Sequence, residues 1–228
     1  MTTPPTTSEA TERAAFLAPL RRALAGVAPV PAPHPVPELV PLGGTDDLLA
    51  AFRAAATAAG AEVVLTDGPT VPPDVLAAWC AAHAVHRAVT SAAPEARAVG
   101  AALAAQGIAV GPASPAAAAA ADLGVTSAAA LVASTGSLAL RSDTDGRLAS
   151  LLPPVHLCVA AVDRLVASPA AILRPLGAAG PPPGLVLVTG TSRTGDIEQI
   201  LTRRVHGPGT VLIVVTGVAP GATATPTA

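Results

Sequence analysis

The stretch "AEVVLTDGPTVPPDVLAAWCAAHAVHRAVTSAAPEARAVGAALAAQGIAV", residues 61–110, carries the pattern from which the fold class is inferred. Short apolar runs alternate in it with segments of helical length, and each helical segment has Pro near its start, where the first turn of a helix tolerates it. The apolar runs are 61–66, 86–91 and 108–110, and the helical segments are 72–83 and 94–107. Strands separated by helices predict parallel pairing with helices over the sheet, so we expect an α/β fold.

The alternation extends to both sides of this stretch. A capped helical segment precedes it, and a Pro-Pro entry to a buried strand follows it at about 155–161. The further segments are a helix at 45–60, a strand at 185–190, a helix at 194–206 and a final strand at 210–215. Between them, two strand-like runs at roughly 127–133 and 137–141 flank "STGS" and predict a hairpin, with Gly136 at a position that needs positive φ.

The two ends of the chain are expected to lie outside the main domain, 42–216. Residues 1–41 predict a helical arm and an extended connector, because Ser8 begins a helical pattern that stops at Gly26 and repeated Pro follows. An apolar helix on such a tether is expected to dock on its own domain or on a partner, a homodimer being one such arrangement. Residues 217–228 are rich in Pro, Thr, Ala and Gly and are expected to be disordered.

Composition narrows the classes of function. Half of the residues are hydrophobic, mostly Ala, Val and Leu, which predicts a core of many small contacts. The chain has no Lys and a formal charge of −2, so it lacks the basic footprint of a nucleic-acid-binding protein. Neither a signal peptide nor an apolar run of membrane-spanning length is present in the sequence, and we expect a cytoplasmic protein.

The sequence offers few ligands for a metal ion or an iron–sulfur cluster. Cys80 and Cys158 are far apart in sequence and match no metal or redox spacing. His83 and His86 have no second pair of ligands, so we expect no metal site there. The "SDTDG" stretch, residues 142–146, lacks the remaining ligands of a calcium loop and is interpreted as a turn.

The segment "LVLVTGTSRTGDIEQ", residues 185–199, passes from the predicted strand into the predicted helix. Residues 190–194 offer amides, hydroxyls and a guanidinium to a phosphate or carboxylate beyond the end of a strand. No P-loop or dinucleotide fingerprint is present, however, and Asp196 and Glu198 place negative charge where an anion would bind. The residues by themselves favour a plain strand-to-helix turn, with a ligand loop as the alternative.

Three longer motifs resemble the LUD-domain family in their order and spacing. They are "GVTSAAALVASTGSLAL", "GRLASLLPPVHLCVAAVDRLV" and "LVLVTGTSRTGDIEQILTRRVHGPGTVLIVV". The resemblance is close over about residues 122–216 and extends to the earlier segments in layout. It implies a three-layer α/β/α sandwich with a mostly parallel sheet, similar to sugar-phosphate isomerase and CoA-transferase domains.

The resemblance also implies a function. It implies an accessory, non-redox role in oxidising L-lactate to pyruvate, beside two partner subunits of which at least one carries iron–sulfur clusters. The absence of cluster ligands here agrees with that division, and no cofactor is expected in this chain. The alternative is an independent enzyme or binding protein for a CoA ester, a sugar phosphate or a nucleotide on the same fold.

The motif matches give a candidate ligand- or partner-binding site. Its residues are Thr135, Gly136, Ser137, His156, Gly190, Thr191, Ser192, Arg193, Thr194, Asp196 and Glu198, with Pro153, Pro154, His206, Gly207 and Pro208 as further motif positions. From the residues alone, a His at the entrance of a buried strand is more often bonded to neighbouring backbone than catalytic. The family usually has Glu before the Thr-Gly of the hairpin, where this chain has Ser134, so no catalytic residue is assigned.

Overall fold

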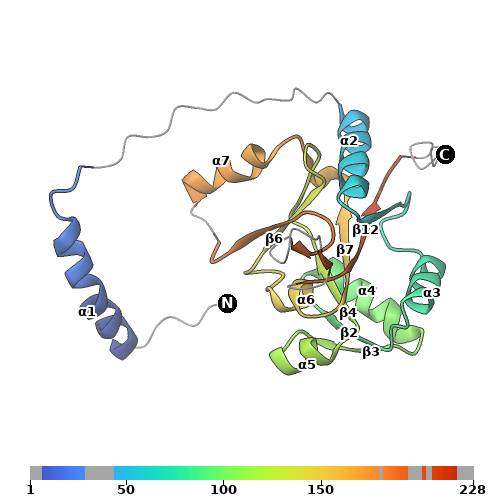
Figure 1. Cartoon of the computed structure of the whole chain (residues 1–228), viewed down its shortest axis with the longest axis horizontal. Helices are drawn as coiled ribbons and strands as arrows, with labels where there is room; N and C mark the ends of the chain where they lie inside the picture. Colours follow the sequence, from blue (N-terminus) through green and yellow to red (C-terminus); the bar gives the residue numbers. More distant parts are fainter. Residues whose placement is uncertain (1–6, 29–43, 180–181, 195–201, 204–206, 220–228) are drawn as a thin grey trace. The chain divides into compact units, whose positions relative to one another are not determined.

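The computed structural model describes residues 7–28, 44–179, 182–194, 202–203 and 207–219 (Figure 1). The chain forms two units, Met1–Pro37 and Glu38–Ala228. The described part of the first unit contains helix α1, Thr7–Leu24, which confirms the predicted N-terminal helix. Its side chains Phe16, Leu20 and Leu24 are exposed. The predicted Pro-rich connector, at 29–43, and the tail from residue 220 lie outside the described residues.

A six-stranded, all-parallel sheet forms the centre of the second unit, with strand order β1-β12-β7-β4-β2-β3. The strands are β1 Glu62–Leu65, β2 Arg87–Thr90, β3 Ala109–Pro112, β4 Leu123–Ser127, β7 Val155–Ala161 and β12 Thr210–Thr216. The first helices are α2 Thr45–Ala58, α3 Pro73–Ala82, α4 Pro94–Ala105 and α5 Pro115–Ala120. The α/β class and the alternation of residues 45–112 are therefore confirmed.

Alternating side chains of the central strands divide the core into two. Val155, Leu157 and Val159 of β7 point into one cluster with α3 and α4, which includes Leu76 and Leu103. Cys158 and Ala160 point into the other cluster, with Phe52 of α2. This second face is covered by α2 together with a second, smaller sheet. Its hairpin and its strand at 185–188 were predicted from the sequence, but their assembly into a separate sheet was not.

The small sheet has four strands in the order β8-β5-β6-β9. They are β5 Ala130–Val132, β6 Ser137–Arg141, β8 Leu165–Val166 and β9 Leu185–Val188. The predicted hairpin is confirmed, since β5 and β6 pair antiparallel and Gly136 between them has φ of 64°. The remaining short elements are α6 Leu148–Leu151, the 3-10 turn η1 Val162–Arg164 and helix α7 Pro169–Ala179.

Two predictions need correction. The run 127–133 is not one strand: Ser127 ends β4 of the large sheet, and β5 begins at Ala130 in the small sheet. The helix expected at 194–206 is wrong where the structure describes it. Arg193–Thr194 (β10) pairs antiparallel with Thr202–Arg203 (β11), so the backbone there makes ladder bonds. The other residues of that segment lie outside the described part of the chain.

The order of the strands creates a switch point in the large sheet. From β2 the chain adds β3 at one edge, whereas from β4 it adds β7 and then β12 toward the other edge. The connections after β2 and β4 therefore run in opposite directions and leave a crevice between the carboxyl ends of these two strands. Ligands of open α/β sheets bind preferentially at such a position.

Candidate functional site

Asp145 lies at the switch point and forms hydrogen bonds at the carboxyl ends of both β2 and β4. Its Oδ1 accepts hydrogen bonds from Ser91 Oγ at 2.8 Å, just after β2, and from the amide of Ser127 at 3.0 Å, at the end of β4. Its Oδ2 accepts a bond from Thr144 Oγ1 at 3.0 Å. Asp145 is only 4% exposed, and three hydrogen-bond donors compensate the burial of its carboxylate. The carboxylate thereby holds the loop 142–147 across the ends of β2 and β4.

A second polar group, Arg164, reaches the same point from the end of β7. Its Nη1 donates to Ser127 Oγ at 2.9 Å and to the carbonyl oxygen of Ala128 at 2.8 Å, and its Nη2 bonds Glu95. Glu95 lies in the first turn of α4. Partial burial by itself would raise the pKa of Glu95, but its own backbone amide and Arg164 outweigh burial and lower it. Ser127 therefore bonds both side chains: its amide donates to Asp145, and its hydroxyl oxygen accepts from Arg164.

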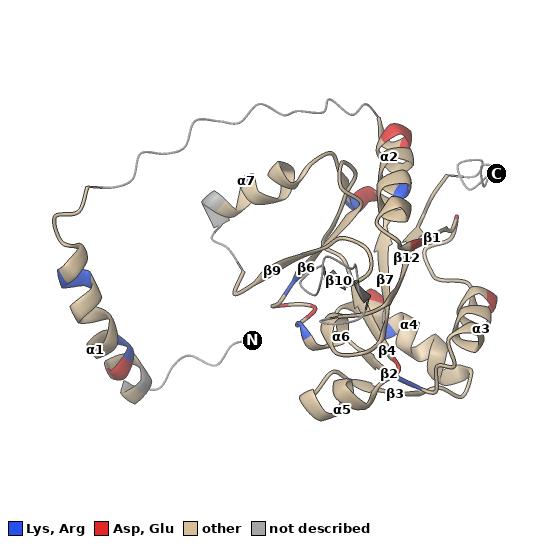
Figure 2. Cartoon of the chain, viewed as in Figure 1, with Lys and Arg blue, Asp and Glu red and all other residues tan. Residues whose placement is uncertain are grey.

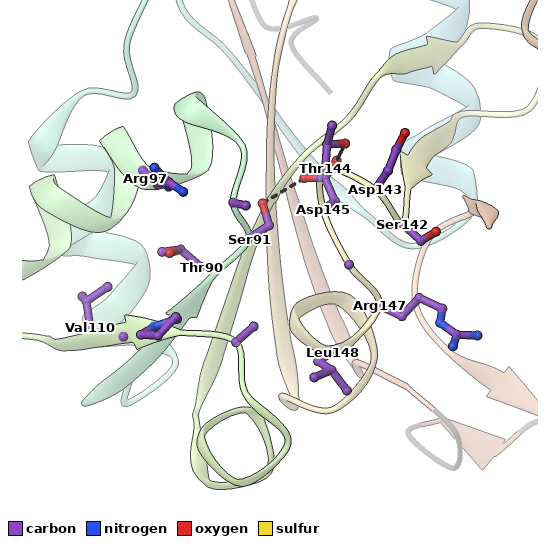
Figure 3. Close-up of a pocket in the computed structure, with 15 residues that line it drawn as sticks. Thr90, Ser91, Arg97, Val110, Ser142, Asp143, Thr144, Asp145, Arg147 and Leu148 are labelled. Carbon is purple, nitrogen blue, oxygen red and sulfur yellow. Dashed lines mark hydrogen bonds between the residues drawn. The ribbon is translucent and has the colours of Figure 1, made fainter. Parts of the chain in front are cut away.

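Two adjoining pockets flank the loop that Asp145 holds. The first, of about 660 Å³, lies between β2, β3, α4 and the loop (Figure 3). The second, of about 520 Å³, lies between α4, Ser127 and Arg164. Both are lined by Asp143, Thr144 and Asp145. We call residues 91, 95, 127, 142–147 and 164 the carboxyl-edge site.

The guanidinium groups around these pockets are of two kinds. Arg141 is 2.7 Å from Asp143 and Arg164 contacts Glu95, so both carry an ion pair. Arg97 and Arg147 line the larger pocket, and within the described residues neither makes an ion pair. Figure 2 shows how few charged residues the second unit carries, so this concentration of charge stands out.

About half of the residues predicted for the ligand- or partner-binding site lie in a second region of the structure. The hydroxyls of Thr135 and Ser137 are 2.7 Å apart, and Ser137 Oγ is 2.6 Å from Thr189 Oγ1. Because β6 pairs with β9, the predicted hairpin residues lie beside the segment that begins at Gly190. We call residues 134–137 and 189–192 the hairpin–loop region. The structure thus places the hairpin residues Thr135, Gly136 and Ser137 near the start of the predicted loop, through the contact of Ser137 with Thr189.

The two glycines of this region pack against α2. Gly136 has φ of 64° and Gly190 has φ of 65°, a conformation that favours glycine. A Cβ at Gly136 would overlap the backbone of Ala55 and Ala56, and a Cβ at Gly190 would overlap that of Ala59. Both glycines therefore have a packing reason that is independent of any ligand.

The rest of the predicted loop is described only in part. The amide of Ser192 donates to the carbonyl oxygen of Pro208 at 2.9 Å, and a Cβ at Gly207 would lie 3.3 Å from Ser192 Cβ. Arg193 and Thr194 are placed by their backbone in β10. Asp196, Glu198 and His206 lie outside the described residues.

His156 is a core residue. It is fully buried, its Nε2 is 2.8 Å from Thr126 Oγ1, and its Nδ1 has no partner within the described part of the chain. Burial lowers the pKa of His156 to about 4, so the imidazole is neutral near pH 7. It lines neither of the two pockets, and no hydrogen bond among the described residues joins it to the hairpin–loop region.

The carboxyl-edge site was not predicted from the sequence, in which residues 142–146 indicated only a turn. One signal was present. A Thr-Ser pair marks the carboxyl end of both strands: Thr90 ends β2 and Ser91 follows it, and Thr126 and Ser127 end β4. Two adjacent parallel strands that end in hydroxyl residues place polar groups at one edge of the sheet, where a following Asp can bind them.

The chain belongs to the LUD domain family, which matches residues 49–216. A curated relative, lactate utilization protein C of Deinococcus radiodurans, is 33% identical over 102 residues, or 42% of this chain and 47% of that protein. The match therefore spans about half the length of the relative. A solved structure from the same organism, described as a DUF162 family protein, has a TM-score of 0.57 and 23% identity, over 77% of this chain and 99% of that one. It supports the fold.

Proposed function

We propose that this LUD-domain protein is an accessory, non-redox subunit of a lactate-utilization system that oxidises L-lactate to pyruvate, with iron–sulfur subunits as partners. The observation that carries the proposal is the similarity to lactate utilization protein C. Over the described residues, no helix is long and apolar enough to cross a bilayer.

The placement of the cysteines supports a non-redox role. Cys80 packs in the cluster with α3 and α4, whereas Cys158 packs in the cluster on the other face of the large sheet. Burial raises the pKa of both thiols, that of Cys158 to about 12. Two protonated thiols on opposite faces of a sheet do not form a ligand set for a cluster. The electron carriers are therefore expected in the partner subunits.

The test is reconstitution with and without this chain. Candidate iron–sulfur subunits from the same organism would be purified alone and together with it, and assembly and lactate oxidation would be measured. We expect both to fall when the chain is omitted. Oxidation at the same rate without it, together with normal growth of a deletion strain on lactate, would rule the role out.

The hairpin–loop region is the proposed contact for a partner or a small ligand. Ser134, Thr135 and Thr189 are exposed on it and stand beside the motif residues. A Thr135→Arg substitution should weaken co-purification with the iron–sulfur subunits because it adds a bulky charge to this surface. Ala104→Arg, at an exposed position of α4 on the other face of the large sheet, is the matched control.

A second candidate is favoured by the carboxyl-edge site. The pocket of about 660 Å³ lies at the carboxyl ends of β2 and β3, beside the switch point, and has the size of small-molecule sites in α/β proteins. An independent enzyme or binding protein for a CoA ester, a sugar phosphate or a nucleotide would use it. A thermal-shift screen of the isolated chain against these three classes discriminates, since flat melting curves for all of them count against this candidate.

A further inference from the structure

We propose that the larger pocket of the carboxyl-edge site binds a small organic oxyanion, a carboxylate or a phosphate monoester, between Arg97 and Arg147. The inference concerns the isolated chain and does not depend on a role in lactate oxidation. It rests on the position of the pocket, on the state of the charges around it and on the chemistry of its walls.

The position is set by the topology. Thr90 and Ser91 at the end of β2, residues 110–113 at the end of β3 and the loop 142–148 surround the pocket. In Figure 3, Arg97 projects from α4 on one side and Arg147 stands on the loop on the other, with Ser91 and Asp145 between them. A ligand in this pocket would therefore have an arginine on either flank, of which Arg147 extends away from Arg97 in this view.

The charges favour an anion in this pocket over the adjoining one. In the smaller pocket both guanidinium groups, Arg141 and Arg164, are already neutralised by Asp143 and Glu95. In the larger pocket Arg97 and Arg147 have no ion pair among the described residues, and the buried carboxylate of Asp145 is satisfied by hydroxyl and amide donors. Asp143 also lines this pocket, but Arg141 neutralises it. The two unpaired guanidinium groups therefore exceed the one remaining carboxylate, and the larger pocket has a net positive charge.

The walls indicate an organic ligand. Val110, Pro112, Ala113 and Leu148 supply apolar surface, which a bare inorganic anion would leave uncovered. The hydroxyls of Thr90 and Ser142 have no hydrogen-bond partner among the described residues and can bond a ligand. The lining of this pocket, as described, has no aromatic side chain, so it lacks a platform on which a nucleobase would stack.

The experiment is a binding titration of the purified chain by calorimetry at low salt. The probes are L-lactate and pyruvate as carboxylates, glycerol 3-phosphate as a phosphate monoester and inorganic phosphate for comparison. We expect at least one organic probe to saturate, with Kd raised about tenfold or more in the Arg97→Gln/Arg147→Gln double variant, because each guanidinium makes a charge-assisted hydrogen bond. Higher salt should weaken binding as well. Arg174→Gln, an exposed arginine of α7 that lines neither pocket, should leave Kd unchanged.

A second variant tests the pocket without removing an arginine. A Cβ at Gly111 would meet nothing within 4 Å, so Gly111→Asp adds a carboxylate to the wall without a clash of its Cβ. It should weaken oxyanion binding while the melting temperature stays close to that of the wild type. Saturation by L-lactate or pyruvate would indicate that the pocket binds the substrate or the product of lactate oxidation. Saturation by glycerol 3-phosphate alone would indicate a ligand unrelated to that reaction. An unchanged Kd in the double variant, or no saturation by any organic probe below about 10 mM, would overturn the proposal.

Discussion

The hairpin–loop region and the carboxyl-edge site are built from similar residues but differ in how these residues are used. In the hairpin–loop region, Gly136 and Gly190 let the chain approach the backbone of α2, and its hydroxyls bond one another. In the carboxyl-edge site, Asp145 and Arg164 tie three strand ends together and border two pockets. A run of Gly, Thr and Ser that stands out in the sequence can therefore be a packing device. Residues from five separate places in the sequence can meanwhile form the polar centre.

The largest expected effect is at Gly136. Gly136→Ala should lower the free energy of unfolding by about 3 kcal/mol or more, because the strain of positive φ adds to overlap with the backbone of α2. Gly146→Ala is the matched control: its φ is 63°, but a Cβ there meets nothing within 4 Å, so about 1 kcal/mol is expected. Urea unfolding measures both. Equal losses would show that packing on α2 contributes nothing.

The next effect tests whether His156 is part of the core. The pKa of His156 is about 4 in the folded chain against 6.5 for an unperturbed imidazole, so the unfolded state takes up a proton first as the pH falls. The free energy of unfolding should therefore drop between pH 6.5 and about 4, by up to about 3 kcal/mol, and show no such dependence above pH 6.5. His156→Gln should remove this part of the slope. His86→Gln, at an exposed histidine, is the control for removal of an imidazole. An unaltered slope in His156→Gln would mean that His156 does not cause the slope, as expected if water reaches its imidazole.

Two aspartates of the carboxyl-edge site, Asp145 and Asp143, are expected to contribute differently to the free energy of unfolding. Asp145→Ala should cost about 2 kcal/mol, because it leaves the buried amide of Ser127 and the hydroxyl of Ser91 without their acceptor. Asp143→Ala removes an exposed carboxylate from the same loop and should leave the free energy of unfolding nearly unchanged. Urea unfolding at pH 7 separates them, and equal stabilities would deny Asp145 its role in holding the loop.

How much could be predicted from the sequence follows from the range of the interactions. The strand at 155–161 and the helices of residues 45–107 are encoded locally, by apolar runs, caps and Pro at helix starts, and they appear as expected. The small sheet depends on the pairing of β6 with β9, more than forty positions apart, which no local pattern reveals. The error at 194–206 has a different origin, because Thr194 pairs with the nearby Thr202 in an antiparallel ladder within a segment whose apolar spacing predicted a helix. Asp145 likewise bonds Ser91, 54 positions away, and Ser127, 18 positions away, so only the fold brings these residues together.

The smallest expected effect distinguishes the two arginines that carry ion pairs. Arg164→Met keeps an apolar stem but removes three hydrogen bonds, to Ser127, Ala128 and Glu95. Since the pair is about one-third exposed, we expect a loss of about 1 kcal/mol, whereas Arg141→Met should have no measurable effect. The pH dependence of the free energy of unfolding gives a further check. The interactions that lower the pKa of Glu95 stabilise the folded state only while its carboxylate is ionised. The difference between the wild type and Arg164→Met should thus be full above pH 4.5 and narrow as the pH falls below it. A difference that stays constant down to pH 3 would assign the whole effect to the neutral acceptors, Ser127 and Ala128, and would leave Glu95 outside the site.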